Sequence, residues 1–102
     1  METNRLELQR LLEDILGSRN VYYQPPASMK IKYPAIVYGL AGIDTRHANN
    51  RIYNHMLKYE ITMIDDDVDE TVFMKILNLP NCKYDRSFVT ENLNHNVFTL
   101  YH

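Results

Sequence analysis

Three aspartates in the middle of the chain have the alternating spacing of a calcium-binding loop. Asp65, Asp67 and Asp69 match positions 1, 3 and 5 of that pattern. The pattern also needs glycine at position 6 and glutamate at position 12, where this sequence has Glu70 and Ile76. We therefore predict no metal site and interpret the run as an exposed acidic turn before a helix, whose dipole stabilises carboxylates at its N-terminus. A weak contact of two carboxylates with a divalent ion is the alternative.

The histidines and the single cysteine lack the spacing of a zinc site. His47, His55, His95 and His102 are scattered, and none pairs with Cys82 as zinc ligands do. A final hairpin would place Cys82 and His95 on adjacent strands, but the sequence marks no third residue to activate them. We therefore interpret Cys82 as a packed strand thiol, and we expect no catalytic residue, no cofactor and no enzymatic activity.

A short basic segment is the best candidate for a contact surface. Arg46, His47 and Arg51 lie in residues 41–54, which show no apolar periodicity and separate two predicted strands. These cations are too few to supply nucleic-acid affinity, so an acidic patch on a neighbouring subunit is an equally good partner. We predict a long polar loop here, because loops of this length usually carry a binding function. Asp44 completes the candidate set in this segment.

The composition is that of one small domain spanning residues 1–102. The formal net charge is −2, and one cysteine allows no intrachain disulfide. Neither a basic stripe nor a long apolar run suggests a nucleic-acid or membrane partner.

The elements that would position these residues follow from hydrophobic periodicity. From Leu57 to Ile64 apolar and polar residues alternate, which predicts a central strand with one buried face. Asp67 and Glu70 have the spacing of a capping pair for the second helix. We predict helices at 4–16 and about 68–78, an edge strand or ordered loop at 21–24, and strands at 33–40, 53–64, 82–90 and 95–101. The predicted class is α+β: a twisted, mainly antiparallel sheet of four to five strands with two helices on one face.

The order of these segments resembles a known family. The chain is similar to the small tail-completion, or tail-terminator, proteins of long non-contractile-tailed bacteriophages and prophages of Gram-positive bacteria. The resemblance covers nearly the whole chain and lies in the segments Ile15–Gly17, Asn20–Pro26, Lys32–Tyr38, Ile43–Arg46, Tyr59–Asp65, Leu79–Arg86 and Asn92–Tyr101.

The resemblance implies a structural role in the virion. Such proteins form a ring, usually a hexamer, that caps the head-proximal end of the tail tube, stops its polymerisation and joins it to the neck. The implied partners are other copies of the chain, the tail tube protein and a neck or head-completion protein, with viral DNA passing through the ring. The implied location is the tail–neck junction, after assembly in the host cytoplasm. A head-closure or stopper ring and a small monomeric adaptor are the alternatives.

The family also suggests a role for the basic segment. By position, residues 44–51 would face a neighbouring subunit or the tube. Our hypothesis is that Arg46 and Arg51 pair with the acidic turn 65–70 of the next subunit in the ring.

Overall fold

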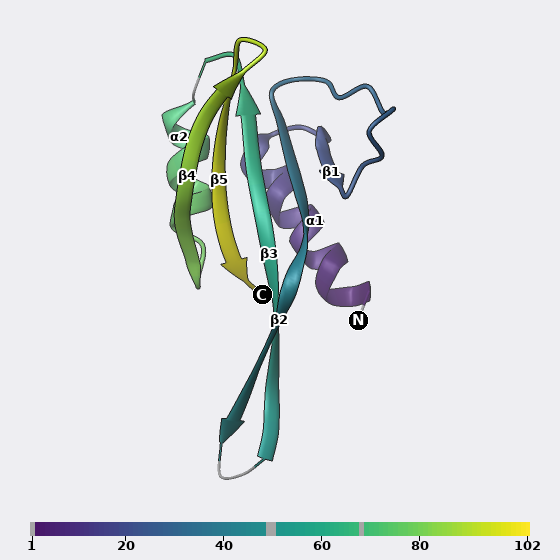
Figure 1. Cartoon of the computed structure of the whole chain (residues 1–102), viewed down its shortest axis with the longest axis vertical. Helices are drawn as coiled ribbons and strands as arrows, with labels where there is room; N and C mark the ends of the chain where they lie inside the picture. The colour runs from purple at the N-terminus through teal and green to yellow at the C-terminus, as the bar shows by residue number, and fades with distance from the viewer. Residues whose placement is uncertain (1, 49–50, 68) are drawn as a thin grey trace.

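The chain folds into a five-stranded sheet with two helices against one of its faces (Figure 1). The computed structural model describes residues 2–48, 51–67 and 69–102, and for residues 2–4, 43–48 and 51–56 it describes the backbone only. In chain order the elements are α1 (Glu2–Leu16), β1 (Val21–Tyr23), β2 (Ala35–Ala48), β3 (Arg51–Asp65), α2 (Glu70–Leu77), β4 (Cys82–Thr90) and β5 (Leu93–Tyr101).

The sheet is mainly antiparallel, which confirms the predicted α+β class. Its strand order is β1-β2-β3-β5-β4, and the short edge strand β1 is the one parallel neighbour, paired with β2. Figure 1 shows α1 and α2 behind the sheet, so the opposite face carries no helix. This is the architecture expected when apolar faces of helices and strands bury one another in two layers.

The core lies between the helices and β3, as the alternation in β3 predicted. Tyr59, Ile61 and Met63 are buried, and Leu57 on the same face packs against them. The core cluster consists of apolar side chains from both helices and from every strand except β4: Leu8, Leu12, Val21, Ile36, Tyr38, Tyr59, Ile61, Met63, Val72, Ile76, Phe98 and Leu100. The central strand is therefore held by neighbours on both sides and by the helices behind it.

The prediction of a long polar loop at residues 41–54 is wrong. β2 continues to Ala48 and β3 begins at Arg51, so the two strands stay paired far beyond the body of the sheet. Apolar and polar residues do not alternate in this segment of the sequence, and the register of the backbone shows the strand pair. Residues 49 and 50 lie outside the described residues.

The structure also settles two shorter segments. Residues 21–23 form an edge strand, and the turn of the last hairpin is the two-residue pair Glu91–Asn92. Both turn residues have positive φ, of 53° and 63°, as a type I′ turn requires. The Tyr33–Pro34 bond is cis.

The second helix is capped by Asp69 and not by the predicted Asp67. The Asp69 carboxylate accepts hydrogen bonds from the backbone N–H groups of Thr71, at 2.9 Å, and Val72, at 3.3 Å. The helix begins at Glu70, two residues later than predicted, and the predicted first residue, 68, lies outside the described residues.

Substitution of each aspartate tests which of the two caps the second helix. We expect Asp69→Ala to lower the free energy of unfolding by about 1 kcal/mol, because two backbone donors lose their acceptor. Asp67→Ala removes an exposed carboxylate and should change the free energy by less than about 0.5 kcal/mol. Urea denaturation of both variants at a concentration where the chain is monomeric makes the comparison, and equal effects would contradict the assignment of Asp69 as the cap.

Candidate assembly interface

The outer part of the β2–β3 hairpin projects from the body as a two-stranded arm. We call residues 42–48 and 51–56 the arm; its register includes Asp44 opposite Met56 and ends with Ala48 opposite Arg51. β1 pairs with β2 at residues 36–38, β5 pairs with β3 from Lys58 onward, and His102 exchanges two backbone hydrogen bonds with Leu57. Within the described chain, no third strand lies beside the arm. The arm makes the molecule elongated, with extents of 49 × 25 × 23 Å, and Figure 1 shows it standing clear of both helices.

The four basic-segment candidates all lie on the arm. Asp44 and Arg46 are in β2, opposite Met56 and Asn54, and His47 follows at a register shift. Arg51 opens β3. Their side chains lie outside the described residues, so the structure places these positions through the backbone alone.

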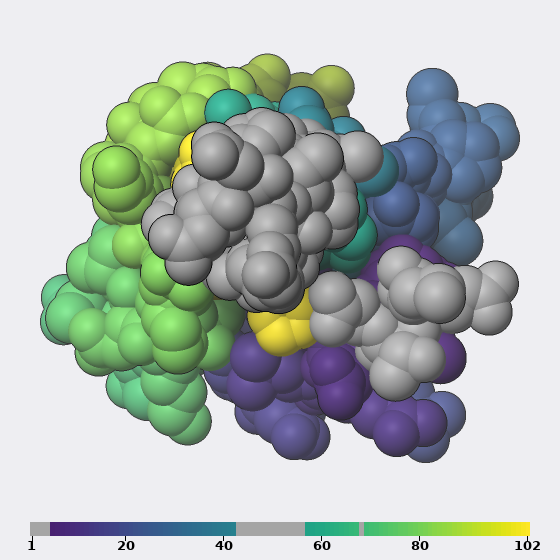
Figure 2. Space-filling view, turned by 90° about the horizontal axis from the view of Figure 1, so that it is seen from below, coloured from purple at the N-terminus to yellow at the C-terminus, as the bar shows by residue number. Residues whose placement is uncertain are grey.

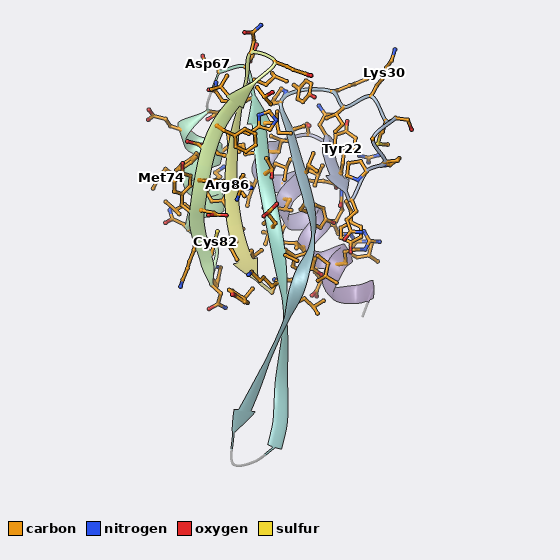
Figure 3. All side chains as sticks on the ribbon, viewed as in Figure 1. Tyr22, Lys30, Asp67, Met74, Cys82 and Arg86 are labelled. Carbon is orange, nitrogen blue, oxygen red and sulfur yellow. The ribbon has the colours of Figure 1, made fainter. Side chains whose placement is uncertain are left out.

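The three acidic candidates lie at the opposite end of the molecule. β3 runs from Arg51 at the outer end of the arm to Asp65, a rise of roughly 45 Å at about 3.3 Å per residue. Figure 3 shows Asp67 at the end of the body away from the arm. Within one copy, the basic and acidic candidates are therefore too far apart to interact.

Only part of the acidic run is free to meet a partner. Asp65 is 8% exposed and accepts a hydrogen bond from the Asp67 N–H at 3.3 Å, while Asp69 caps α2. Asn94 donates to the backbone oxygen of Asp66 at 3.2 Å and so ties the turn to β5. The carboxylates of Asp66 and Asp67 are exposed. Asp66 belongs to the predicted acidic turn 65–70 but was not named as a candidate, because the 1, 3, 5 spacing singles out its neighbours.

Cys82 and His95 do not form a pair. Cys82 lies opposite Leu100 and His95 lies opposite Phe88, at different levels of the β4–β5 ladder. Burial raises the pKa of the Cys82 thiol, which is the reverse of what an activated nucleophile needs. The His95 ring stacks on Phe88 with centroids 4.7 Å apart, and its Nδ1 lies 3.1 Å from the Leu93 oxygen. Among the described residues, no three His, Cys, Asp or Glu side chains gather as a metal site would need.

Three exposed apolar side chains lie along β4. Tyr84, Phe88 and Val89 are 44%, 43% and 67% exposed, and the strand lies at the edge of the sheet. The sequence predicted strands at 82–90 and 95–101 but did not show which of them is outermost. Strand order made β4 the edge, because β5 pairs with β3.

Comparisons with known proteins add no family: no protein-family model, curated protein or solved structure matches the chain. None of the helices described here is long and apolar enough to span a membrane.

The buried carboxyl at the end of β3 predicts a pH effect. Desolvation, with a further contribution from the neighbouring Asp66 carboxyl, raises the pKa of Asp65 above its ordinary value of 3.8. The folded chain therefore holds this proton more tightly than the unfolded chain, and the stability that it contributes is present at low pH and lost as the pH rises through the raised pKa.

We therefore expect Asp65→Asn to be more stable than the unmodified chain at neutral pH, with a difference that shrinks toward zero below the ordinary pKa of 3.8. Urea denaturation across this range measures it, with Asp67→Asn at an exposed position as the control. A constant difference at all pH values would show that the effect of Asp65→Asn does not come from its ionisation.

Proposed function

We propose that this chain is the subunit of a ring that caps the head-proximal end of a phage tail tube, ends tube polymerisation and joins the tail to the neck. The proposal rests on the resemblance of the sequence to tail-completion proteins. The observation that supports it best is the arm, a strand pair that no third strand of the described chain extends.

The arm needs a partner to be stable. A two-stranded hairpin is marginal in water by itself, and its outer edges present unpaired backbone N–H and C=O groups. In the described chain β2 and β3 of the arm pair only with each other. A partner strand that pairs with the arm would form hydrogen bonds with these groups. In an assembly of identical chains, every subunit has a neighbouring copy that can be this partner.

An arm that contacts a different surface of its neighbour favours a ring. Such a contact is heterologous, and repeated heterologous contacts close into rings when the rotation between subunits allows it. The exposed acidic turn and the basic positions Arg46 and Arg51 lie at opposite ends of β3, so head-to-tail neighbours can bring them together. Each exposed ion pair contributes only about 0–1 kcal/mol, so apolar and backbone contacts must supply most of the association.

Replacing residues 45–55 by Asn-Gly tests the role of the arm. Leu57 directs its backbone N–H and C=O toward His102, so Met56 directs its own backbone groups toward Asp44, its partner in the register. A two-residue turn can therefore close the Asp44–Met56 pair. Because the buried core lies in the body, we expect cooperative unfolding to persist while rings and tube capping are lost. Light scattering over a wide concentration range, electron microscopy and capping of cognate tail tubes provide the readouts.

The same measurements on the unmodified chain decide the function itself. We expect closed rings in solution or on the ends of tubes. A chain that stays monomeric at every concentration and leaves tubes uncapped would contradict the proposal and favour the monomeric adaptor.

The charge pairing between neighbours predicts a second effect. We expect Arg46→Glu with Arg51→Glu to weaken ring formation or tube capping, because the arm would then repel the acidic turn. Lys30→Glu with Lys32→Glu changes the net charge equally at exposed positions on the loop between β1 and β2 and should leave assembly intact. Unchanged assembly of the arginine variant would rule out this pairing without touching the proposal of a ring.

A further inference from the structure

The two edges of the sheet differ in how they are covered. At the β1 edge, Gln9 of α1 donates to the backbone oxygen of Val21 at 3.0 Å and accepts from the Tyr38 hydroxyl. Pro25 and Pro26 then end the strand, and the Gln24 side chain accepts from the N–H of Leu40 at 2.9 Å. This edge is three residues long, and α1 covers one of its outward carbonyl groups, which are usual protections against strand addition.

The β4 edge has no such cover. It is nine residues long, and no other described segment pairs with it on its outer side. Figure 2, which views the molecule from below, shows the loop after β1 (blue) at one side and β4 (yellow-green) at the other, outermost in the sheet. The first half of β4 carries Lys83, Asp85 and Arg86 and a register shift, features that discourage pairing. The second half, residues 87–90, is uncharged.

The last hairpin shows which backbone groups of β4 point outward. Its two-residue turn makes Thr90 and Leu93 a hydrogen-bonded pair, because that pair closes the turn. Such pairs alternate along an antiparallel ladder, so Phe88 also directs its N–H and C=O toward β5. Ser87 and Val89 direct theirs away from the sheet, beside the exposed side chains of Phe88 and Val89.

We propose that this open edge of β4 takes up, as an added antiparallel strand, residues 42–48 of the arm of a second copy. The inference rests on the proposed function and states how one subunit of the ring would hold the next. The free edge of residues 42–48 has the same need for a partner as β4, and both are runs of unpaired backbone groups in the described structure.

Strand direction favours this pairing. β2 is antiparallel to β3, β3 to β5 and β5 to β4, so β2 and β4 run in opposite directions. Neighbouring copies of similar orientation therefore present β4 to β2 as an antiparallel pair, which continues the ladder already present in each subunit.

The dimensions of the sheet and arm agree. Five strands spaced about 4.8 Å apart make a sheet roughly 24 Å wide. In sheets that close on themselves the strands tilt by about 35–45°, which displaces each copy along the strands by roughly 17–24 Å. Residues 42–48 extend about 23 Å at 3.3 Å per residue. Ser87 is level with Met63 through Asn96, and Thr45 is level with His55. The two positions are therefore offset along β3 by about eight residues, or roughly 26 Å. This offset lies close to the upper end of the displacement.

A proline at an outward position tests the inference directly. Val89→Pro removes an outward N–H and leaves the hydrogen bonds to β5, so the variant should fold like Val89→Ala, which keeps the N–H. We expect Val89→Pro to lower ring association or tube capping about tenfold or more, and Val89→Ala to retain both. Rings of unchanged stability in folded Val89→Pro would overturn the inference.

Cross-linking tests the same contact without relying on the proline variant. In a Cys82→Ala chain, Thr45→Cys places a thiol on the arm and Ser87→Cys places one on the β4 edge. We expect a short bifunctional thiol reagent to give covalent oligomers up to the full ring only when both cysteines are present. Covalent dimers from Ser87→Cys alone would indicate pairing of two β4 strands and overturn the inference.

The two proposals fail in different ways. Rings that form without the cross-link between residues 45 and 87 overturn the inference and leave the proposed function standing. A chain that neither forms rings nor caps tubes overturns the proposed function, and missing cross-links in that chain overturn the inference as well. A synthetic peptide from another neck protein can be added to the chain together with tail tubes. Capping that occurs only when such a peptide binds the β4 edge would also contradict a second copy as the occupant of that edge.

Discussion

The antiparallel pairing of β2 with β3 is the interaction on which the rest of the structure depends. At one end of this ladder, Ile36 and Tyr38 face Met63 and Ile61, and these pairs are buried beneath the helices. At the other end, the same ladder continues past the body to Ala48 and Arg51. One continuous pair of strands therefore supplies both the centre of the core and the arm.

The two ends of this ladder are stabilised differently. Inside the body, apolar burial reinforces the backbone hydrogen bonds, at about 25 cal/mol for each Å² of apolar surface removed from water. Along the arm, the described structure shows strand pairing without a third element beside it. In the body, other strands and the helices lie beside the β2–β3 ladder, whereas in the described chain no third strand lies beside the arm. The proposed assembly with further copies would supply that missing neighbour.

Particular residues show how far the sequence could be interpreted. Both helices and the alternation of β3 were predicted, because each is a local period in apolar residues. The prediction of a loop at 41–54 was wrong, because these strands have no apolar alternation in the sequence by which a strand could be recognised. The N-cap was assigned to Asp67, since several aspartates there satisfy the same local rule, and backbone geometry selected Asp69. The resemblance to tail-completion proteins remains a prediction.

The sequence by itself determined the α+β class, the elements with a buried face and the separation of a basic from an acidic segment. Each of these follows from residue type and spacing along a short stretch of chain. Only the tertiary structure decided that the acidic run and the basic positions lie at opposite ends of the β2–β3 ladder, that Cys82 and His95 are apart, and that β4 is the open edge. These properties depend on which strands pair and in what register, and pairing joins residues far apart in the chain, where no local pattern records it.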